Sequence, residues 1–263
     1  MVRICAVVFS LALSANAWGQ LSLKKLVLKP KEVYELKGTD ILVVDSLILH
    51  ESSTLVLNKL KANNFIHAKV MVFYKGSLID GSGVIGLKGR KGHKGNSPPN
   101  PCTDGGDAAQ GIEGTYGGHG INVSLYFSEI IIHGPVTINV SGGDGGDGGD
   151  GGDGGGGGPG TRICKGGDGG SGGNGAKGAY GGNSGNVTFT APAIPELRLM
   201  LGEKVIVKNY GGNGGLGGDG GGRGLAGLSN VGNTKLDGKV GKKGLKGQDG
   251  IKGKPGSINF ADK

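Results

Sequence analysis

The chain has 263 residues, of which 62 are glycine and only 9 are proline, and 5% of its residues are aromatic. This proline content is far too low for an ordinary collagen, although glycine at a local period of three is a strong compositional signal. The formal net charge of +8 favours partners that carry negative charge.

Residues 1–17 are typical of a secretory signal peptide. Arg3 gives a positive start, 4–13 is mostly apolar, and 15–17 forms an A-x-A cleavage site. The apolar run is too short to span a membrane, and no later segment is a transmembrane candidate. We therefore expect an exported protein, in the periplasm, on the cell surface or outside the cell.

Two cysteines, Cys102 and Cys164, lie outside the predicted signal peptide. An even pair in an oxidising compartment indicates a disulfide, and two unpaired thiols are the alternative. Closing a loop of about sixty residues would stabilise the fold by ~4 kcal/mol in the chain-entropy treatment.

From Leu21 to Asp80 the chain contains short β-branched and aliphatic runs separated by polar, turn-like clusters such as 51–53 and 62–64. The regular spacing of these runs predicts strands, and no sustained helical period is present. The runs are 41–44, 47–49, 55–57 and 70–73. Because long polar excursions separate the later strands, we expect an all-β fold, a β-solenoid similar to a parallel β-helix. A β-sandwich is the alternative.

Three Gly-rich excursions interrupt the predicted solenoid. Each leaves a strand and rejoins a strand, and each divides into an outgoing and a returning arm around a tip where the period of three fails. The predicted solenoid core is 18–85, continued by 120–141, 186–210 and 257–263. The excursions are 86–119, 142–185 and 211–256, which together make up the region 86–256.

The clearest arm is 142–158, which reads GGDGGDGGDGGDGGGGG. A period of three fits neither an α-helix nor a strand, but it fits an extended helix of the polyproline II type. Bare glycine edges let neighbouring helices bond backbone to backbone, because no Cβ intervenes. We therefore predict that the three hairpins pack as a polyglycine II bundle. A flexible glycine linker is the alternative.

The arms differ in the number of their bare edges. GGX arms have two bare edges and suit interior positions, whereas GXY arms have one and suit the periphery. The GGX arms are 142–158, 166–182 and 211–221, and the GXY arms are 86–95 and 238–256. The GXY side chains are largely basic and could bind a polyanion such as an acidic polysaccharide; a solvated basic face is the alternative. Little aromatic interleaving argues against nucleic acid.

No metal, cofactor or catalytic residue is expected. Neighbouring Asp side chains of 142–158 would stand ~9 Å apart, too far to share one cation. The histidines are scattered and lack the spacing of zinc ligands.

We expect recognition at the three tips, because loops displayed by a rigid scaffold usually carry binding. The predicted disulfide would join the first tip to the second. The expected partner is a cell-surface or extracellular macromolecule, with polyanionic glycans as one class. The candidate binding residues are Pro98, Pro99, Asn100, Thr161, Arg162, Ile163, Lys165, Leu228, Asn230 and Val231.

Residues 142–158, the arm 238–256 and the strand–excursion–strand pattern together resemble two groups of glycine-rich proteins. One is the adhesins at the tips of phage tail fibres, and the other is the snow-flea antifreeze proteins. The GXY arms also look like collagen triplets. The resemblance implies a polyglycine II bundle with function at its tips or on its faces. A signal peptide departs from the phage proteins, and ladders of Asp and Lys depart from antifreeze faces.

These observations predict a non-enzymatic protein that works by adhesion or recognition through its tips, or that has a structural role in an envelope or matrix. One alternative is an ice- or crystal-surface-binding protein. The other is a carbohydrate-active solenoid enzyme, for which the sequence nominates no carboxylate pair.

Overall fold

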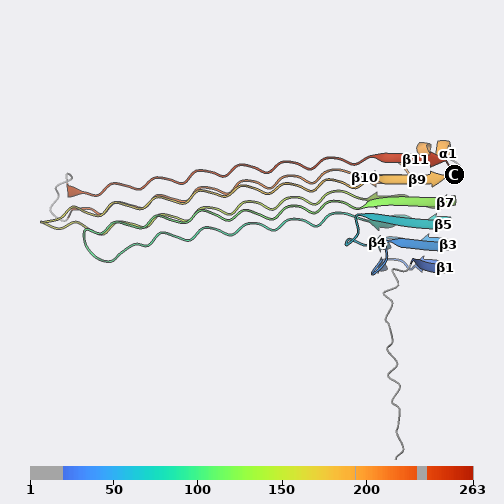
Figure 1. Ribbon diagram of the computed structural model, residues 1–263, viewed down its shortest axis with the longest axis horizontal. Helices are drawn as coiled ribbons and strands as arrows, with labels where there is room; N and C mark the ends of the chain where they lie inside the picture. Colours follow the sequence, from blue (N-terminus) through green and yellow to red (C-terminus); the bar gives the residue numbers. More distant parts are fainter. Residues whose placement is uncertain (1–19, 193, 230–235, 263) are drawn as a thin grey trace, which may run out of the picture.

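The computed structural model describes residues 20–192, 194–229 and 236–262, and most of its regular structure lies in two parallel β-sheets (Figure 1). The predicted signal peptide lies outside the described residues. Sheet A consists, in order, of β1 (Leu21–Leu28), β3 (Ile41–Leu49), β5 (Asn63–Phe73), β7 (Asn122–Ile132), β9 (Val187–Ala191) and β11 (Ile258–Asp262). Sheet B consists of β2 (Val33–Glu35), β4 (Thr54–Val56), β6 (Leu78–Asp80), β8 (Val136–Asn139) and β10 (Val205–Lys208).

Consecutive strands alternate between the two sheets, so each coil of the chain contributes one strand to each sheet. Every neighbouring pair is parallel, as in the register of Leu49 with Phe73 between β3 and β5. The prediction of an all-β, parallel, solenoid-like fold is therefore confirmed.

The core lies between the two sheets and follows from alternation along each strand. In β3, Leu42, Leu47 and Leu49 are buried, and Leu55 of β4 meets them from the opposite sheet. Burying one such side chain contributes ~1.5–3 kcal/mol relative to leaving it exposed. The buried side chains of successive coils form one continuous cluster.

The corner between sheet A and sheet B is the same in the first three coils. Lys31, Ser52 and Gly76 all adopt a positive φ, of 63°, 56° and 75°. The backbone N–H of each donates to the next coil, Lys31 to Glu51 and Ser52 to Lys75. This stacked left-handed turn returns the chain across the core at the same place in each coil.

Two features differ from the sequence-based expectation. Asn63 and Asn64, predicted in a turn, begin β5, because the buried Asn64 amide accepts the backbone N–H of Asn58 at 2.8 Å and donates to its carbonyl. The helix α1 (Ile194–Met200), which no period predicted, replaces the tight corner between β9 and β10. It buries Ile194 and Leu197 against the core.

The Gly-rich segments leave the ends of β6, β8 and β10 and return at the starts of β7, β9 and β11. They occupy the place of the short connectors 36–40 and 57–62 of the first two coils. Figure 1 shows them as long wavy traces that run side by side and continue the direction of the strands. None of the helices in the described residues is long and apolar enough to cross a membrane.

Candidate recognition surfaces on the glycine-rich arms

Six Gly-rich arms extend from the sheets (Figure 1). Arms 1, 3 and 5 run outward from sheet B, and arms 2, 4 and 6 run back into sheet A. We define them as arm 1 (82–97), arm 2 (103–121), arm 3 (141–158), arm 4 (166–186), arm 5 (209–228) and arm 6 (237–257).

The arms are bonded to one another through their backbones in a pattern that repeats every three residues. Gly145 N–H donates to Asn213 O of arm 5 at 2.8 Å, and Gly146 N–H donates to Thr115 O of arm 2 at 3.0 Å. The same pattern repeats along each arm. Arms 3 and 4 each bond to four other arms, whereas arms 1 and 6 each bond to two.

Many of the glycines lie where two backbones approach too closely for a Cβ. A Cβ added to Gly146 or Gly149 would overlap the carbonyl oxygen of Leu87 or Arg90 on arm 1. Gly156 differs, because the nearest atom to an added Cβ is 3.8 Å away. Gly156 occupies the triplet position at which arm 3 carries its four Asp residues. This position therefore faces outward and accepts a side chain.

The Asp side chains of arm 3 bond to the backbone of arm 5. Asp144 Oδ1 accepts the N–H of Asn213 at 2.6 Å, and Asp147 Oδ1 accepts that of Leu216 at 2.8 Å. Asp150 and Asp153 repeat the contact. These carboxylates accept backbone N–H groups of arm 5 that have no backbone carbonyl partner on a neighbouring arm. The sequence does not reveal this role, because donor and acceptor lie 69 residues apart.

Two carboxyl groups on the arms have perturbed acidity. The backbone N–H of Gly222 and the Lys91 ammonium hold the pKa of the Asp153 carboxyl below its usual range. The Lys165 ammonium and the backbone N–H of Lys239 do the same for the pKa of Asp168. Both shifts favour the charged acceptor that the inter-arm bond uses.

The first two tips are tied together at the far end of the arms. The predicted pair is confirmed: Cys102 and Cys164 form a disulfide with a Cα–Cα distance of 6.0 Å. Gly160 N–H of the second tip donates to Leu228 O, at the end of arm 5, at 2.9 Å. A disulfide is compatible with an exported protein.

The predicted tip residues differ in what they offer a partner. Ile163 and Leu228 are 96% and 66% exposed, whereas the Thr161 hydroxyl lies 3.2 Å from Cys164 Sγ and accepts the Ile163 N–H inside a turn. Lys165 pairs with Asp168 at 2.8 Å. Pro99, Asn100 and Arg162 are exposed and Pro98 is half-buried, while Asn230 and Val231 lie outside the described residues.

Arm 6 carries an exposed row of lysines, which we call the lysine edge: Lys239, Lys242, Lys243, Lys246, Lys252 and Lys254. None of these ammonium groups forms an ion pair within 4.0 Å in the described part of the chain. The carboxylate of Asp249, on the same arm, accepts the backbone N–H of Gly217 at 2.7 Å. The edge therefore presents largely uncompensated positive charge.

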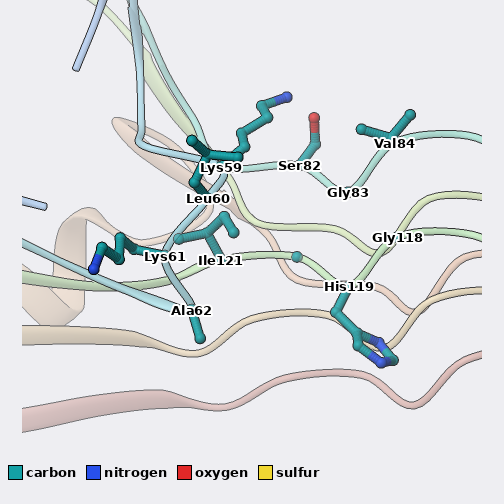
Figure 2. A pocket seen from close by; sticks show the side chains of 11 residues that line it. Lys59, Leu60, Lys61, Ala62, Ser82, Gly83, Val84, Gly118, His119 and Ile121 are labelled. Atoms are coloured by element: carbon teal, nitrogen blue, oxygen red, sulfur yellow. The ribbon is translucent and has the colours of Figure 1, made fainter. Parts of the chain in front are cut away.

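A small hollow lies where the connector 57–62 meets the base of arms 1 and 2, with a volume of about 320 Å³. Figure 2 shows Leu60 beside Ile121, with Lys59 and Lys61 extending to opposite sides. Lys59 pairs with Asp80 at 3.2 Å, so the positive charge of this lysine at the hollow is balanced by a carboxylate. Within the described ranges, no group of three or more His, Cys, Asp or Glu side chains could hold a metal ion.

No family model and no curated protein matches the chain. Among solved structures, a springtail antifreeze protein from Granisotoma rainieri, described as a bundle of nine polyproline type II helices, is similar to it. The match has 24% identity over 62% of this chain and 92% of that protein, with a TM-score of 0.12. A TM-score this low does not establish a shared fold.

Proposed function

We propose that this chain is an exported, non-enzymatic recognition protein. Its Gly-rich arms form a polyglycine II bundle, and its tips contact a cell-surface or extracellular macromolecule. The observation that carries the proposal is the linkage of the tips. The disulfide Cys102–Cys164 joins the first two tips, and the bond from Gly160 to Leu228 joins the second tip to the end of arm 5.

Two features of the arms support the bundle. Backbone bonds recur at the period of three residues that an extended polyglycine II helix has. Gly146 and Gly149 lie where a Cβ would overlap a neighbouring backbone. A flexible linker would need neither feature.

The tip chemistry fits a binding interface. Ile163 and Leu228 place apolar side chains in solvent, where they contribute nothing to the solenoid core. Arg162, next to Ile163 in the sequence, is exposed and carries a guanidinium group. Arginine is enriched in protein interfaces and their hot spots, and exposed apolar side chains supply contact area that a partner can bury.

The test is binding of the mature protein to a microarray of cell-surface glycans and to a panel of extracellular matrix proteins. We compare the wild type with the double variant R162S/I163S, and with L60S, which removes a 93% exposed leucine from the solenoid connector. Binding should fall by about tenfold or more in the tip variant, a loss typical of hot-spot residues, and should be unchanged in L60S. Full retention of binding by the tip variant would contradict tip recognition.

The lysine edge favours a polyanionic glycan as a second class of partner. Its side chains occupy both non-glycine positions of the triplets, Lys239, Lys242 and Lys254 at the first and Lys243, Lys246 and Lys252 at the second. Equivalent positions of successive triplets are ~9 Å apart along an extended helix, and the arm has two neighbours. Such a linear array attracts a linear polyanion, and the attraction weakens as salt shortens the screening length.

A further inference from the structure

We propose that a site for a neutral pyranose of a glycan chain lies on the flank of arms 2 and 4, around Tyr116 and Tyr180. The site lies on a different part of the arms from the tips and does not depend on them. It is a hollow of about 390 Å³, lined by Tyr116, Gly117, His119, Tyr180, Gly181 and Asn183. This volume lies within the range of ~300–1,000 Å³ that small-molecule sites usually have.

Two aromatic rings, Tyr116 and Tyr180, line the hollow. Their centroids are 5.7 Å apart with a tilt of 43°, and Tyr116 is 68% exposed. Lys177 fixes the second ring, because its Nζ donates to the Tyr180 hydroxyl at 2.6 Å and lies 4.3 Å from the ring centroid. The Tyr116 ring is therefore open to solvent, and it lies beside the Tyr180 ring, which Lys177 holds in place. The C–H face of a pyranose is apolar and packs on such a surface.

His119 and Asn183, which also line the hollow, supply hydrogen-bond donors whose orientation is set by the fold. His119 Nδ1 accepts the backbone N–H of Asn183 at 2.9 Å, so the proton of the neutral imidazole is on Nε2. Asn183 Oδ1 accepts the N–H of Lys254 at 2.9 Å, which leaves its amide NH₂ as a donor. Sugar hydroxyls accept hydrogen bonds from both group types.

The lining favours a neutral ligand over an ionic one. None of the lining residues is an aspartate, a glutamate, a lysine or an arginine. Gly117 and Gly181 line the hollow with backbone alone, because a Cβ at either position would overlap a carbonyl oxygen of a neighbouring arm, Gly143 O or Gly212 O. An aromatic wall with a few oriented polar groups is the usual composition of a ligand pocket.

The experiment measures binding of cellohexaose, mannohexaose and chitohexaose by isothermal titration calorimetry, with heparin as the polyanionic comparison. The variants are Y116A and Y116F. The control is L245A, which removes a 70% exposed leucine from arm 6 outside the hollow. Slow amide exchange at Gly146 in each variant shows that the arms are intact. Tyr116 occupies an outward position, so its truncation leaves the backbone contacts of arm 2 in place.

We expect the wild type to bind at least one hexaose. Affinity should fall by about tenfold in Y116A, stay within about threefold in Y116F, and be unchanged in L245A. The tip variant R162S/I163S should keep the hexaose affinity, which separates this site from tip recognition. Absence of hexaose binding at millimolar concentration, binding of heparin alone, or equal affinity in Y116A would overturn the proposal.

Discussion

Asp153 Oδ1 accepts the backbone N–H of Gly222 at 2.7 Å, although the two residues are 69 positions apart in the chain. This contact joins arm 3 to arm 5 and is repeated along the Asp ladder by Asp144, Asp147 and Asp150. The ladder therefore links arms, in addition to keeping the surface charged.

The Asp153 contact predicts a loss of stability in acid. The depressed pKa of Asp153 means that its stabilising effect is fully present above the unfolded-state value near 3.8 and is lost as pH falls through the lower folded-state value. Denaturation midpoints measured between pH 2 and pH 6 should fall at the acid end. Asp45 and Asp168, whose pKa values are also lowered, contribute in the same direction.

The variant D153N separates this carboxylate from the others. The amide still offers Oδ1 to Gly222 but no longer titrates, so the acid-dependent fall in stability should become shallower. A pH profile identical to that of the wild type would show that Asp153 stays uncoupled from folding.

Adjacent glycines should respond in opposite ways to alanine. In G155A the new Cβ would overlap Asn96 O, and overpacking of this kind costs about 1–3 kcal/mol or more. G156A adds its Cβ in open space and should raise the unfolding free energy by ~0.4–1 kcal/mol through the unfolded state. Chemical denaturation measures both. Equal effects of the two substitutions would be incompatible with packed arms.

Removing the disulfide should loosen the tips more than the solenoid. In C102S/C164S the loop between positions 62 residues apart is no longer closed, which lowers stability by ~4 kcal/mol in the chain-entropy treatment. Amide exchange should accelerate around Gly160 first, while β3 and β5 keep their protection. Uniform acceleration in both parts would show that the tips and the solenoid unfold as one unit.

The lysine edge predicts salt-sensitive retention on immobilised heparin. K242Q/K243Q/K246Q should elute at lower salt than the wild type. The control K37Q/K59Q/K69Q removes the same formal charge from lysines that are paired with Glu35, Asp80 and Asp45. Equal shifts in the two triple variants would mean that net charge, and not the edge, governs retention.

The β-rich part of the fold was predictable because it depends on local pattern. Runs such as 41–44 and 47–49 alternate buried and open side chains within one strand, β3. The disulfide was predictable from cysteine number and from the placement of Cys102 and Cys164 at two tips. The polyglycine II assignment and tip recognition stay predictions.

The helix α1 and the hollow at Tyr116 and Tyr180 depend on tertiary contacts that local sequence patterns do not indicate. The helix α1 is a single short element set by burial of Ile194 and Leu197 against the core. The hollow at Tyr116 and Tyr180 depends on residues 64 positions apart that meet only when arms 2 and 4 lie side by side. Two tyrosines at outward positions of Gly-rich arms were its only sequence signal.

The most direct test of the packed arms is backbone amide exchange on the mature protein, oxidised and then reduced. We predict slow exchange at the glycine amides of 142–158 and 238–256 in the oxidised form, because these donors bond to neighbouring arms. After reduction, exchange should quicken near the tips and stay slow near the sheets. Random-coil exchange rates along both segments in both forms would contradict the bundle and leave the tips without a rigid support.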